Sequence, residues 1–245
     1  MELYIIRHGQ STNNALLDVS TRHHDPALTD LGKRQSEKLA EWLAAGDLRI
    51  PWSDPDTGFT RLDPIPEFKF DHLYCSAMYR AMLTALPVSQ ALGINPEIWI
   101  DIHEHGGMYL EAADGTITGY PGRTREEISA EFPQYAVPSD VTEKGWYRME
   151  NGHEERGTFY GRAIRVANEI RRRAEDPETM NDRIGIITHG TFIDALIKAF
   201  LNMLPSRSFF FLHYNTAITR LDFNDRGVLM RCTNRIDHLP NDMIS

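Results

Sequence analysis

The chain has 245 residues, of which 41% are hydrophobic and 25% charged, so it can bury a sizeable core as an ordinary globular protein. Its 26 Lys and Arg residues against 35 Asp and Glu residues give a net charge of −9, which disfavours nucleic acid and anionic membranes as partners because it repels polyanions. Only two cysteines, no apolar run near the ~18 residues of a membrane span, and an N-terminus without signal-peptide character predict a cytoplasmic protein.

Short apolar runs rich in β-forming residues alternate along the chain with segments of helical periodicity. The predicted strands are residues 3–6, 70–75, 98–102 and 184–188, followed by a hairpin of 217–223 and 228–233. The predicted helices begin after Thr29, after Ser76 and at Thr124, and two more lie over 159–174 and 192–203. Pro87 is expected to kink or shorten the second helix. Strands that alternate with helices favour a three-layer α/β fold, with a mostly parallel central sheet flanked by helices.

Two stretches rich in Pro, Gly and polar residues interrupt this alternation, at 47–67 and 105–155. We interpret them as insertions over the carboxyl edge of the sheet, within a single domain that spans residues 1–245, because long loops of this kind often cover active sites. The aromatic residues of the second stretch either line a substrate lid or pack the insertion down: Tyr109, Tyr120, Trp146 and Tyr147.

Charged and polar side chains follow each predicted inner strand. In chain order, they are Arg7 and His8, then Arg80 one helical turn after Ser76, then Glu104, and finally His189. In open α/β sheets ligands bind outside the carboxyl ends of the strands, so we expect these side chains to converge there. Each of them alone has an ordinary structural explanation, but together they make a cationic pocket with one acid, which suits a phosphate ester.

The motifs that carry these residues recur in one known order. They are RHGQSTNN at 7–14, LTDLGKRQS at 28–36, CSAMYRAMLTA at 75–85, the Glu104 region, EEISAEFP at 126–133 and ITHGTFIDALI at 187–197. Together they resemble the histidine phosphatase superfamily, in its phosphoglycerate mutase-like branch. The resemblance covers most of the chain and implies a phosphoglycerate mutase-like fold and a phosphohistidine mechanism. It assigns the site to Arg7, His8, Asn14, Arg80, Glu104 and His189.

The expected roles follow from charge and proton requirements. His8 attacks phosphorus through a neutral ring nitrogen, and Arg7 and Arg80 both disfavour its protonation and bind the phosphate oxygens. Glu104 protonates the leaving alcohol and then activates water, and His189 adds a further donor. Neutral contacts to the substrate are expected from Asn14, Gln10, Ser11 and Gly190.

Two departures from the family pattern stand out, and the second of them favours a phosphatase over a mutase. The residue after Gly9 is Gln10, where many relatives carry glutamate, and the proline run and paired arginines of the mutases are absent, with Arg123 and Arg125 as the nearest substitute. Mutases need extra basic residues to hold a bisphosphate, so their scarcity favours transfer to water. The substrate is a phosphate ester whose identity stays open among sugar phosphates, phosphoglycerates, nucleotides and phosphoproteins.

Two other functions, a metal site and a phosphate-binding module, fit the sequence less well, and one assembly, a homodimer, is compatible with it. The run His103-Glu104-His105, even with His23 and His24, has no third ligand at metal-binding spacing, so we expect no metal ion and no cofactor. A phosphate-binding module without catalysis would retain the arginines and lose the nucleophile or the acid, yet both are present here. A homodimer is possible through an exposed sheet edge near the C-terminal hairpin.

Overall fold

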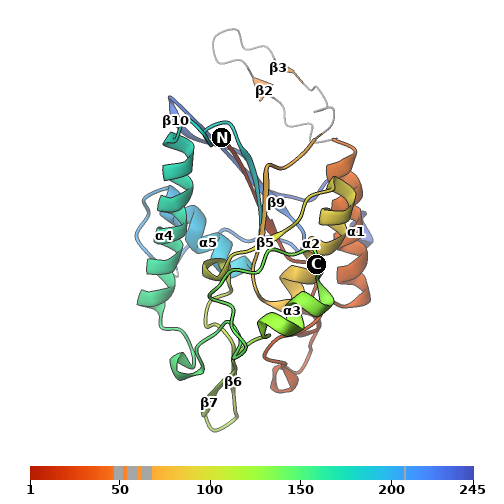
Figure 1. The fold of residues 1–245 in the computed structure, drawn as a ribbon, viewed down its shortest axis with the longest axis vertical. Helices are drawn as coiled ribbons and strands as arrows, with labels where there is room; N and C mark the ends of the chain where they lie inside the picture. The colour runs from red at the N-terminus through yellow and green to blue at the C-terminus, as the bar shows by residue number, and fades with distance from the viewer. Residues whose placement is uncertain (47–51, 54–59, 62–67, 207) are drawn as a thin grey trace.

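A computed structural model describes residues 1–46, 52–53, 60–61, 68–206 and 208–245. Its centre is a six-stranded sheet of order β10-β9-β1-β8-β4-β5 (Figure 1). The four strands from β1 to β5 in this order are parallel, whereas β9 and β10 run antiparallel to their neighbours. The strands are β1 (Glu2–Arg7), β4 (His72–Cys75), β5 (Glu97–Ile98), β8 (Arg183–Thr188), β9 (Ile218–Asn224) and β10 (Gly227–Arg235). The mostly parallel sheet confirms the predicted fold class.

Helices cover both faces of this sheet (Figure 1). On one face lie α1 (Asp30–Ala44), α2 (Tyr79–Leu92) and the short α3 (Arg125–Glu131), and on the other α4 (Arg156–Glu175) and α5 (Gly190–Phe200). The Thr29 side chain caps α1, and a capping box of Thr124 and Glu127 begins α3 as its sequence predicts. In the described residues, no helix combines the length and apolar character needed to cross a membrane.

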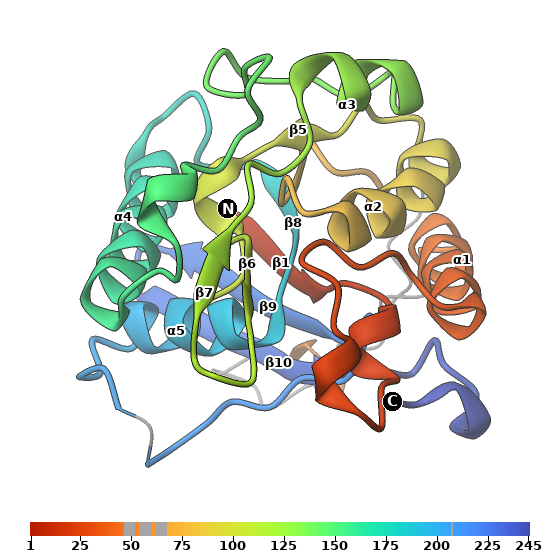
Figure 2. The same cartoon turned by 90° about the horizontal axis from the view of Figure 1, so that it is seen from below.

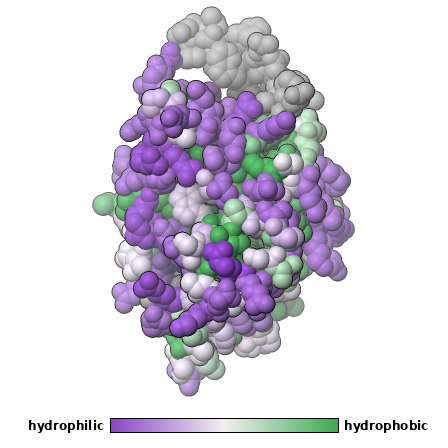
Figure 3. All heavy atoms as spheres, viewed as in Figure 1, coloured by the Kyte–Doolittle hydropathy of each residue, from purple (hydrophilic) through white to green (hydrophobic). Residues whose placement is uncertain are grey.

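The core lies in two layers, one on each side of the sheet. Strand β1 runs between them, and its residues Leu3, Tyr4, Ile5 and Ile6 are fully buried. Tyr4 and Ile6 pack toward α1 and α2, and Leu3 and Ile5 pack toward α4 and α5. The face shown in Figure 3 is mainly hydrophilic, with apolar residues gathered near its centre. A strand buried on both faces positions its last residue rigidly, which matters because β1 ends at Arg7.

The prediction of a strand over 98–102 is wrong. Strand β5 ends at Ile98, and a 3-10 turn, Ile100–Ile102, follows it. The alternating isoleucines reflect burial on opposite sides of the sheet, because Ile98 belongs to one core layer and Ile102 to the other. The segment therefore crosses the end of the sheet instead of extending it. Of the two effects expected of Pro87, shortening of α2 is wrong, because this helix continues to Leu92, and a kink stays a prediction.

The predicted insertion at 47–67 lies outside the described residues, apart from the short pair β2 (Trp52–Ser53) and β3 (Thr60–Arg61). The stretch at 105–155 holds the hairpin of β6 (Tyr109–Glu111) and β7 (Ile117–Gly119), together with α3. In Figure 1 this hairpin lies at the end of the molecule toward which the parallel strands run. It is therefore placed at the carboxyl edge of the sheet.

Candidate active site

A pocket of about 740 Å³ opens at the carboxyl edge of the sheet, the end that faces the viewer in Figure 2. Four of the five residues predicted as catalytic line it, namely Arg7, His8, Arg80 and Glu104. They arrive from the end of β1, the first turn of α2, and the turn after β5. Positive groups thus gather around one histidine, with one carboxylate beside them.

The His8 ring lies at the floor of this pocket and is only 2% exposed. Its Nδ1 donates to the carbonyl of Gly9 at 2.6 Å, so the lone pair is on Nε2. That Nε2 accepts from Nε of Arg80 at 3.1 Å. Burial, then Arg80 and Arg7, hold the pKa of His8 well below its ordinary value, although the Gly9 carbonyl opposes them. The ring is therefore a neutral imidazole, and its Nε2 carries the lone pair on the side of Arg80.

Close backbone packing positions the turn that carries His8. A Cβ atom on Gly9 would lie 2.5 Å from the carbonyl oxygen of Gly32, which is closer than real Cβ atoms approach. The Gly9 N–H donates to Thr84 Oγ1 at 3.0 Å, and Asn215 donates to the His8 carbonyl at 2.9 Å. Gly9 is thus needed for close approach and not for a left-handed backbone, because it is absent from the residues with positive φ.

The two arginines differ in burial, because Arg7 is half-buried and Arg80 is buried. Arg7 donates from Nη1 to the carbonyl of His213 at 2.6 Å, and its buried Nε has no partner among the described residues. Burial lowers the pKa of Arg7 and of Arg80, and the nearby Glu104 carboxylate opposes this in both. Gly190 does not line the pocket, but a Cβ atom there would lie 3.3 Å from Arg7 Nε. Its small size leaves room for the guanidinium.

Asp25 is a buried acid behind Arg80 that the sequence analysis missed. Its Oδ1 accepts from the N–H of Tyr79, the first residue of α2, at 2.9 Å. Burial raises the pKa of Asp25 to about 6, although Arg80 opposes this shift. Oδ2 is buried and has no partner in the described part of the chain. Asp25 therefore supports both the start of α2 and the charge of the arginine that it carries.

Glu104 lies at the N-terminus of α5, where helix N–H groups lack partners within the helix. Oε1 accepts from the N–H of Phe192 at 3.1 Å and of His105 at 2.8 Å, and Oε2 from the N–H of Thr191 at 3.3 Å. These bonds fix the carboxylate at the pocket wall next to both arginines. The first turn of α5, which follows β8, thus positions the side chain of Glu104, which comes after β5 in the sequence.

His189 lies behind the pocket and does not line it. Its ring is fully buried, 5.0 Å from that of His8 between centroids, and Nε2 shares a hydrogen bond of 2.8 Å with Ser76 Oγ. Burial, followed by Arg80, holds the pKa of His189 well below its ordinary value. The ring is therefore neutral, so the further donor expected of His189 would not carry a positive charge.

The predicted neutral contacts separate into two groups. Asn14 and Ser11 line the pocket and bond to each other, with Asn14 Oδ1 accepting from Ser11 N at 3.1 Å. Gln10 does not line it, because its Oε1 accepts from Thr29 Oγ1 at 2.8 Å, at the start of α1. Asn14 and Ser11 thus lie at the site, whereas the Gln10 side chain contacts Thr29, the N-cap residue of α1.

Aromatic rings and one arginine form the outer wall. His24 stacks on Tyr120 with 3.9 Å between centroids, and His23 stacks on His24 at 4.3 Å. Burial raises the pKa of Tyr109 and lowers that of Arg80, and the Arg22 charge opposes the first shift and adds to the second. Arg22 therefore lies between Arg80 and the β6–β7 hairpin. It makes no hydrogen bond or ion pair with any residue that the structure describes. Arg22, His23 and His24 are consecutive in the sequence, and this basic run is the signal from which the wall could have been predicted.

The four aromatic residues of the 105–155 insertion divide between the two roles considered for them. Tyr109 and Tyr120 line the pocket, whereas Trp146 and Tyr147 are buried in the core. Of the two histidines of the His-x-His run, His103 is built into the interior and is 6% exposed. His105 is half-buried, lines the pocket and packs on Phe159 at 4.6 Å. Within the described residues, no group of three or more His, Cys, Asp or Glu side chains could hold a metal ion.

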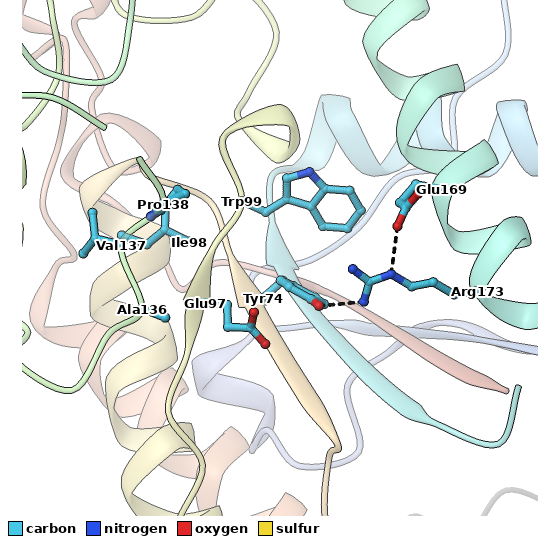
Figure 4. A pocket seen from close by; sticks show the side chains of 9 residues that line it. All are labelled: Tyr74, Glu97, Ile98, Trp99, Ala136, Val137, Pro138, Glu169 and Arg173. Atoms are coloured by element: carbon cyan, nitrogen blue, oxygen red, sulfur yellow. Dashed lines mark hydrogen bonds and ion pairs between the residues drawn. The ribbon is translucent and has the colours of Figure 1, made fainter. Parts of the chain in front are cut away.

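A second pocket, of about 410 Å³, lies beside the edge strand β5 (Figure 4). Its one arginine, Arg173, donates to the hydroxyl of Tyr74 at 2.6 Å and to Glu169 at 3.0 Å. Figure 4 shows this guanidinium between its two partners and Trp99 above them. Because the cation is already paired with a carboxylate, this pocket does not suit a phosphate.

A family model described as the histidine phosphatase superfamily (branch 1) matches residues 3–55 and 62–235. The chain belongs to this superfamily. The match includes every residue of the His8 pocket named above, from Arg7 and His8 at the end of β1 to Tyr120 after the hairpin.

Solved structures of other histidine phosphatase superfamily members share the fold at low sequence identity. A putative alpha-ribazole-5'-P phosphatase from Escherichia coli is 19% identical, with a TM-score of 0.60 over 96% of this chain and 97% of that chain. A phosphoserine phosphatase from Entamoeba histolytica is 21% identical, with a TM-score of 0.57 over 98% and 99%. A mycobacterial glucosyl-3-phosphoglycerate phosphatase is 20% identical, with a TM-score of 0.57 over 96% and 99%.

A curated relative matches only part of the chain. The PE-PGRS family protein PE_PGRS11 of Mycobacterium tuberculosis is 29% identical over 105 residues, which are 42% of this chain. The match covers 14% of that protein's length.

Proposed function

We propose that this protein is a metal-independent phosphatase that hydrolyses phosphate monoesters through a phosphohistidine on His8. The observation that carries the proposal is the neutral His8 ring, whose Nε2 lone pair lies at the floor of a pocket beside Arg7 and Arg80. Phosphoryl transfer requires positioning and neutralisation of the phosphate oxygens, and two guanidinium groups supply both.

The reaction proceeds in two steps. In the first, Nε2 of His8 forms a bond to phosphorus as the ester P–O bond breaks, and Glu104 gives a proton to the leaving alcohol. In the second, Glu104 takes a proton from water, the oxygen of that water bonds to phosphorus, and the His8–phosphorus bond breaks to release phosphate. The Arg80 Nε–H that donates to His8 in the free protein turns to a phosphate oxygen when substrate binds.

Arg22 favours substrates whose leaving alcohol carries a further anionic group. Its charge is at the pocket wall and unpaired within the described residues, so a carboxylate on the leaving group has a partner there. Phosphoserine and 3-phosphoglyceric acid, which are bound in two similar structures, have such a carboxylate and head the substrate panel. Transfer to water in preference to a second substrate, and the cytoplasm as compartment, remain our proposals from the sequence.

The test is phosphate release from a panel of phosphate esters in the presence of EDTA, with His8→Ala as the matched blank. We expect His8→Ala to be inactive and Glu104→Gln to slow turnover by roughly 10²–10⁴-fold. Glu104→Gln should also accumulate an acid-labile phosphoprotein, which mass spectrometry locates on residue 8. Full activity of His8→Ala, or activity that EDTA abolishes, would refute the mechanism.

Arg22→Ala tests the substrate class separately. It should raise KM for phosphoserine and 3-phosphoglyceric acid by about 10-fold, while KM for p-nitrophenyl phosphate, which has no carboxylate, changes little. An equal change for all three substrates would contradict the role of Arg22 without affecting the assignment of His8.

A further inference from the structure

The segment that joins α5 to β9 exposes an unusual number of large apolar side chains. Seven of them are between 39% and 84% exposed: Leu201, Met203, Leu204, Phe209, Phe210, Leu212 and Tyr214. Figure 2 shows the chain between α5 and β9 standing away from the body of the domain. Single apolar residues are normal on a protein surface, but a cluster within one segment marks a site of interaction. We call the described residues 201–206 and 208–214 the apolar segment.

A buried lysine fixes the backbone of the apolar segment from inside. The Lys198 ammonium is 2% exposed and donates to Asp194 Oδ2 at 2.6 Å. It also donates to the carbonyls of Ser206 and Phe209, at 2.9 and 2.6 Å. Asp194 Oδ1 accepts from the N–H of Phe211 at 2.9 Å. Because these buried bonds set the path of the chain, the outward side chains need little further ordering when a partner binds.

The sequence around the apolar segment is also poor in charged residues. Between Lys198 and Arg220 the sequence holds one charged residue, Arg207, although 25% of the whole chain is charged. Depletion of charge together with enrichment in Phe, Tyr and Met is typical of the buried centre of protein–protein interfaces. Two copies of a chain with net charge −9 repel each other least where acidic residues are absent, and the sequence from 199 to 219 holds none.

The exposed area of the apolar segment matches what a dimer requires. The exposed fractions of its seven large residues amount to roughly 700 Å², more than the largest apolar patch of most monomers. Two such surfaces in full contact would bury at most on the order of 1,400 Å², which is within the range of a stable interface. An interface around a twofold axis uses the same patch on both copies, so no second surface is needed.

We propose that the apolar segment is a self-association surface, and that its partner is the same segment of a second copy of this chain. The segment ends against the open edge of the sheet, because the N–H of Tyr214 donates to Asn234 of β10 at 2.7 Å. Its His213 carbonyl accepts from Arg7 Nη1 at 2.6 Å, so the interface borders the floor of the phosphatase site.

The test is the molar mass of the full chain in solution, measured by sedimentation velocity from about 1 to 100 µM. We expect the wild-type protein to have twice the 28.1 kDa mass of the chain at the upper concentrations. Leu204→Asp with Leu212→Asp changes the two most exposed residues of the segment and should weaken dimerisation at least about 100-fold. Leu17→Asp, at a fully exposed leucine elsewhere, is the matched control and should remain dimeric.

Three outcomes would overturn the proposal. They are a wild-type protein that is monomeric at every concentration, a double variant that remains dimeric, and a dimer that Leu17→Asp disrupts to the same extent. A monomer that binds vesicles of neutral phosphatidylcholine through the same two leucines would also overturn it, because the partner would then be a lipid surface. Thermal unfolding of each variant confirms that a loss of mass is not a loss of fold.

Discussion

The protonation state of His8 follows from its surroundings at the level of single residues. Burial disfavours an imidazolium, and Arg80 and Arg7 disfavour it further, in that order. The hydrogen bond from Nδ1 to Gly9 then selects the tautomer whose Nε2 is free to attack. In the proposed mechanism, such a neutral and oriented ring needs no general base before it attacks phosphorus.

We predict that Arg80→Met raises the pKa of His8 toward its ordinary value of 6.5, and that Arg7→Met raises it less. The physical reason is that each substitution removes a nearby positive charge, and without that charge the protonated His8 ring is less strongly repelled. The measurement is an NMR titration of the ring Cε1–H signal of His8, assigned by its absence in His8→Ala. If the pKa is the same in wild type and Arg80→Met, burial alone sets it.

Gly190→Ala should impair catalysis through Arg7. The added methyl group would lie 3.3 Å from Nε of Arg7, close enough to displace the guanidinium by a few tenths of an ångström. We expect kcat/KM to fall by about 10-fold, since small misplacements of positioning groups are costly. Gly157→Ala in α4 is the control, because its Cβ meets nothing within 4 Å and should leave kinetics unchanged.

At the scale of elements, α4 anchors the turn that carries Glu104. Arg162 of α4 is 2% exposed, and its Nη1 donates to the carbonyls of Asp101 and His103, both at 2.7 Å. Its Nε and Nη2 bind both carboxylate oxygens of Glu154, at 2.9 and 2.6 Å. This buried ion pair thus fixes the backbone just before Glu104, and Arg162 acts as a positioning residue.

We predict that Arg162→Met lowers kcat/KM about 10-fold more for alkyl phosphates than for p-nitrophenyl phosphate. A good leaving group needs no proton from Glu104, so a misplaced acid affects only the poor ones. Stability should fall by about 3–5 kcal/mol, because Glu154 is left as an unpaired buried charge. The double variant with Glu154→Met should regain stability but not the alkyl phosphate rate. If kcat/KM falls equally for alkyl phosphates and p-nitrophenyl phosphate, Arg162 has a structural role and does not position Glu104.

Elements differ in how far their place in the site could be predicted from sequence. Strands β1 and β8 are long and apolar, so the positions of Arg7, His8 and His189 after them were predictable. The turn before Glu104 was not, because isoleucines at 98, 100 and 102 have the spacing of a strand yet pack on two sides of the sheet. Contacts such as that of Arg162 with His103, 59 residues apart, have no local signal at all.

At the scale of the whole molecule, buried neutral histidines make stability depend on pH. Burial is the first cause that lowers the pKa of His8, His103, His189 and His238, for His238 to about 4. In the unfolded chain these rings titrate near 6.5, so the unfolded state binds more protons below that pH. Asp25 opposes them, because its raised pKa lets the folded state bind a proton that the unfolded chain lacks between 3.8 and about 6. Burial lowers the pKa of His24 and His213 as well, so the histidines outnumber the one opposing acid and leave a net loss of stability in acid.

We therefore predict that the free energy of unfolding is highest above pH 6.5 and falls as the pH is lowered toward 5. Urea unfolding monitored by fluorescence at each pH gives the profile, and each histidine that is charged only in the unfolded chain contributes about 1.4 kcal/mol per pH unit. His238→Gln isolates one such contribution away from the site, because His238 is 7% exposed and contacts Thr216 at 3.0 Å. Its slope should be smaller than that of the wild type by this amount between about pH 4.5 and 6. A wild-type profile that is flat from pH 7.5 to 5 would show that these rings titrate alike in both states, and the neutral His8 on which catalysis depends would lose its explanation.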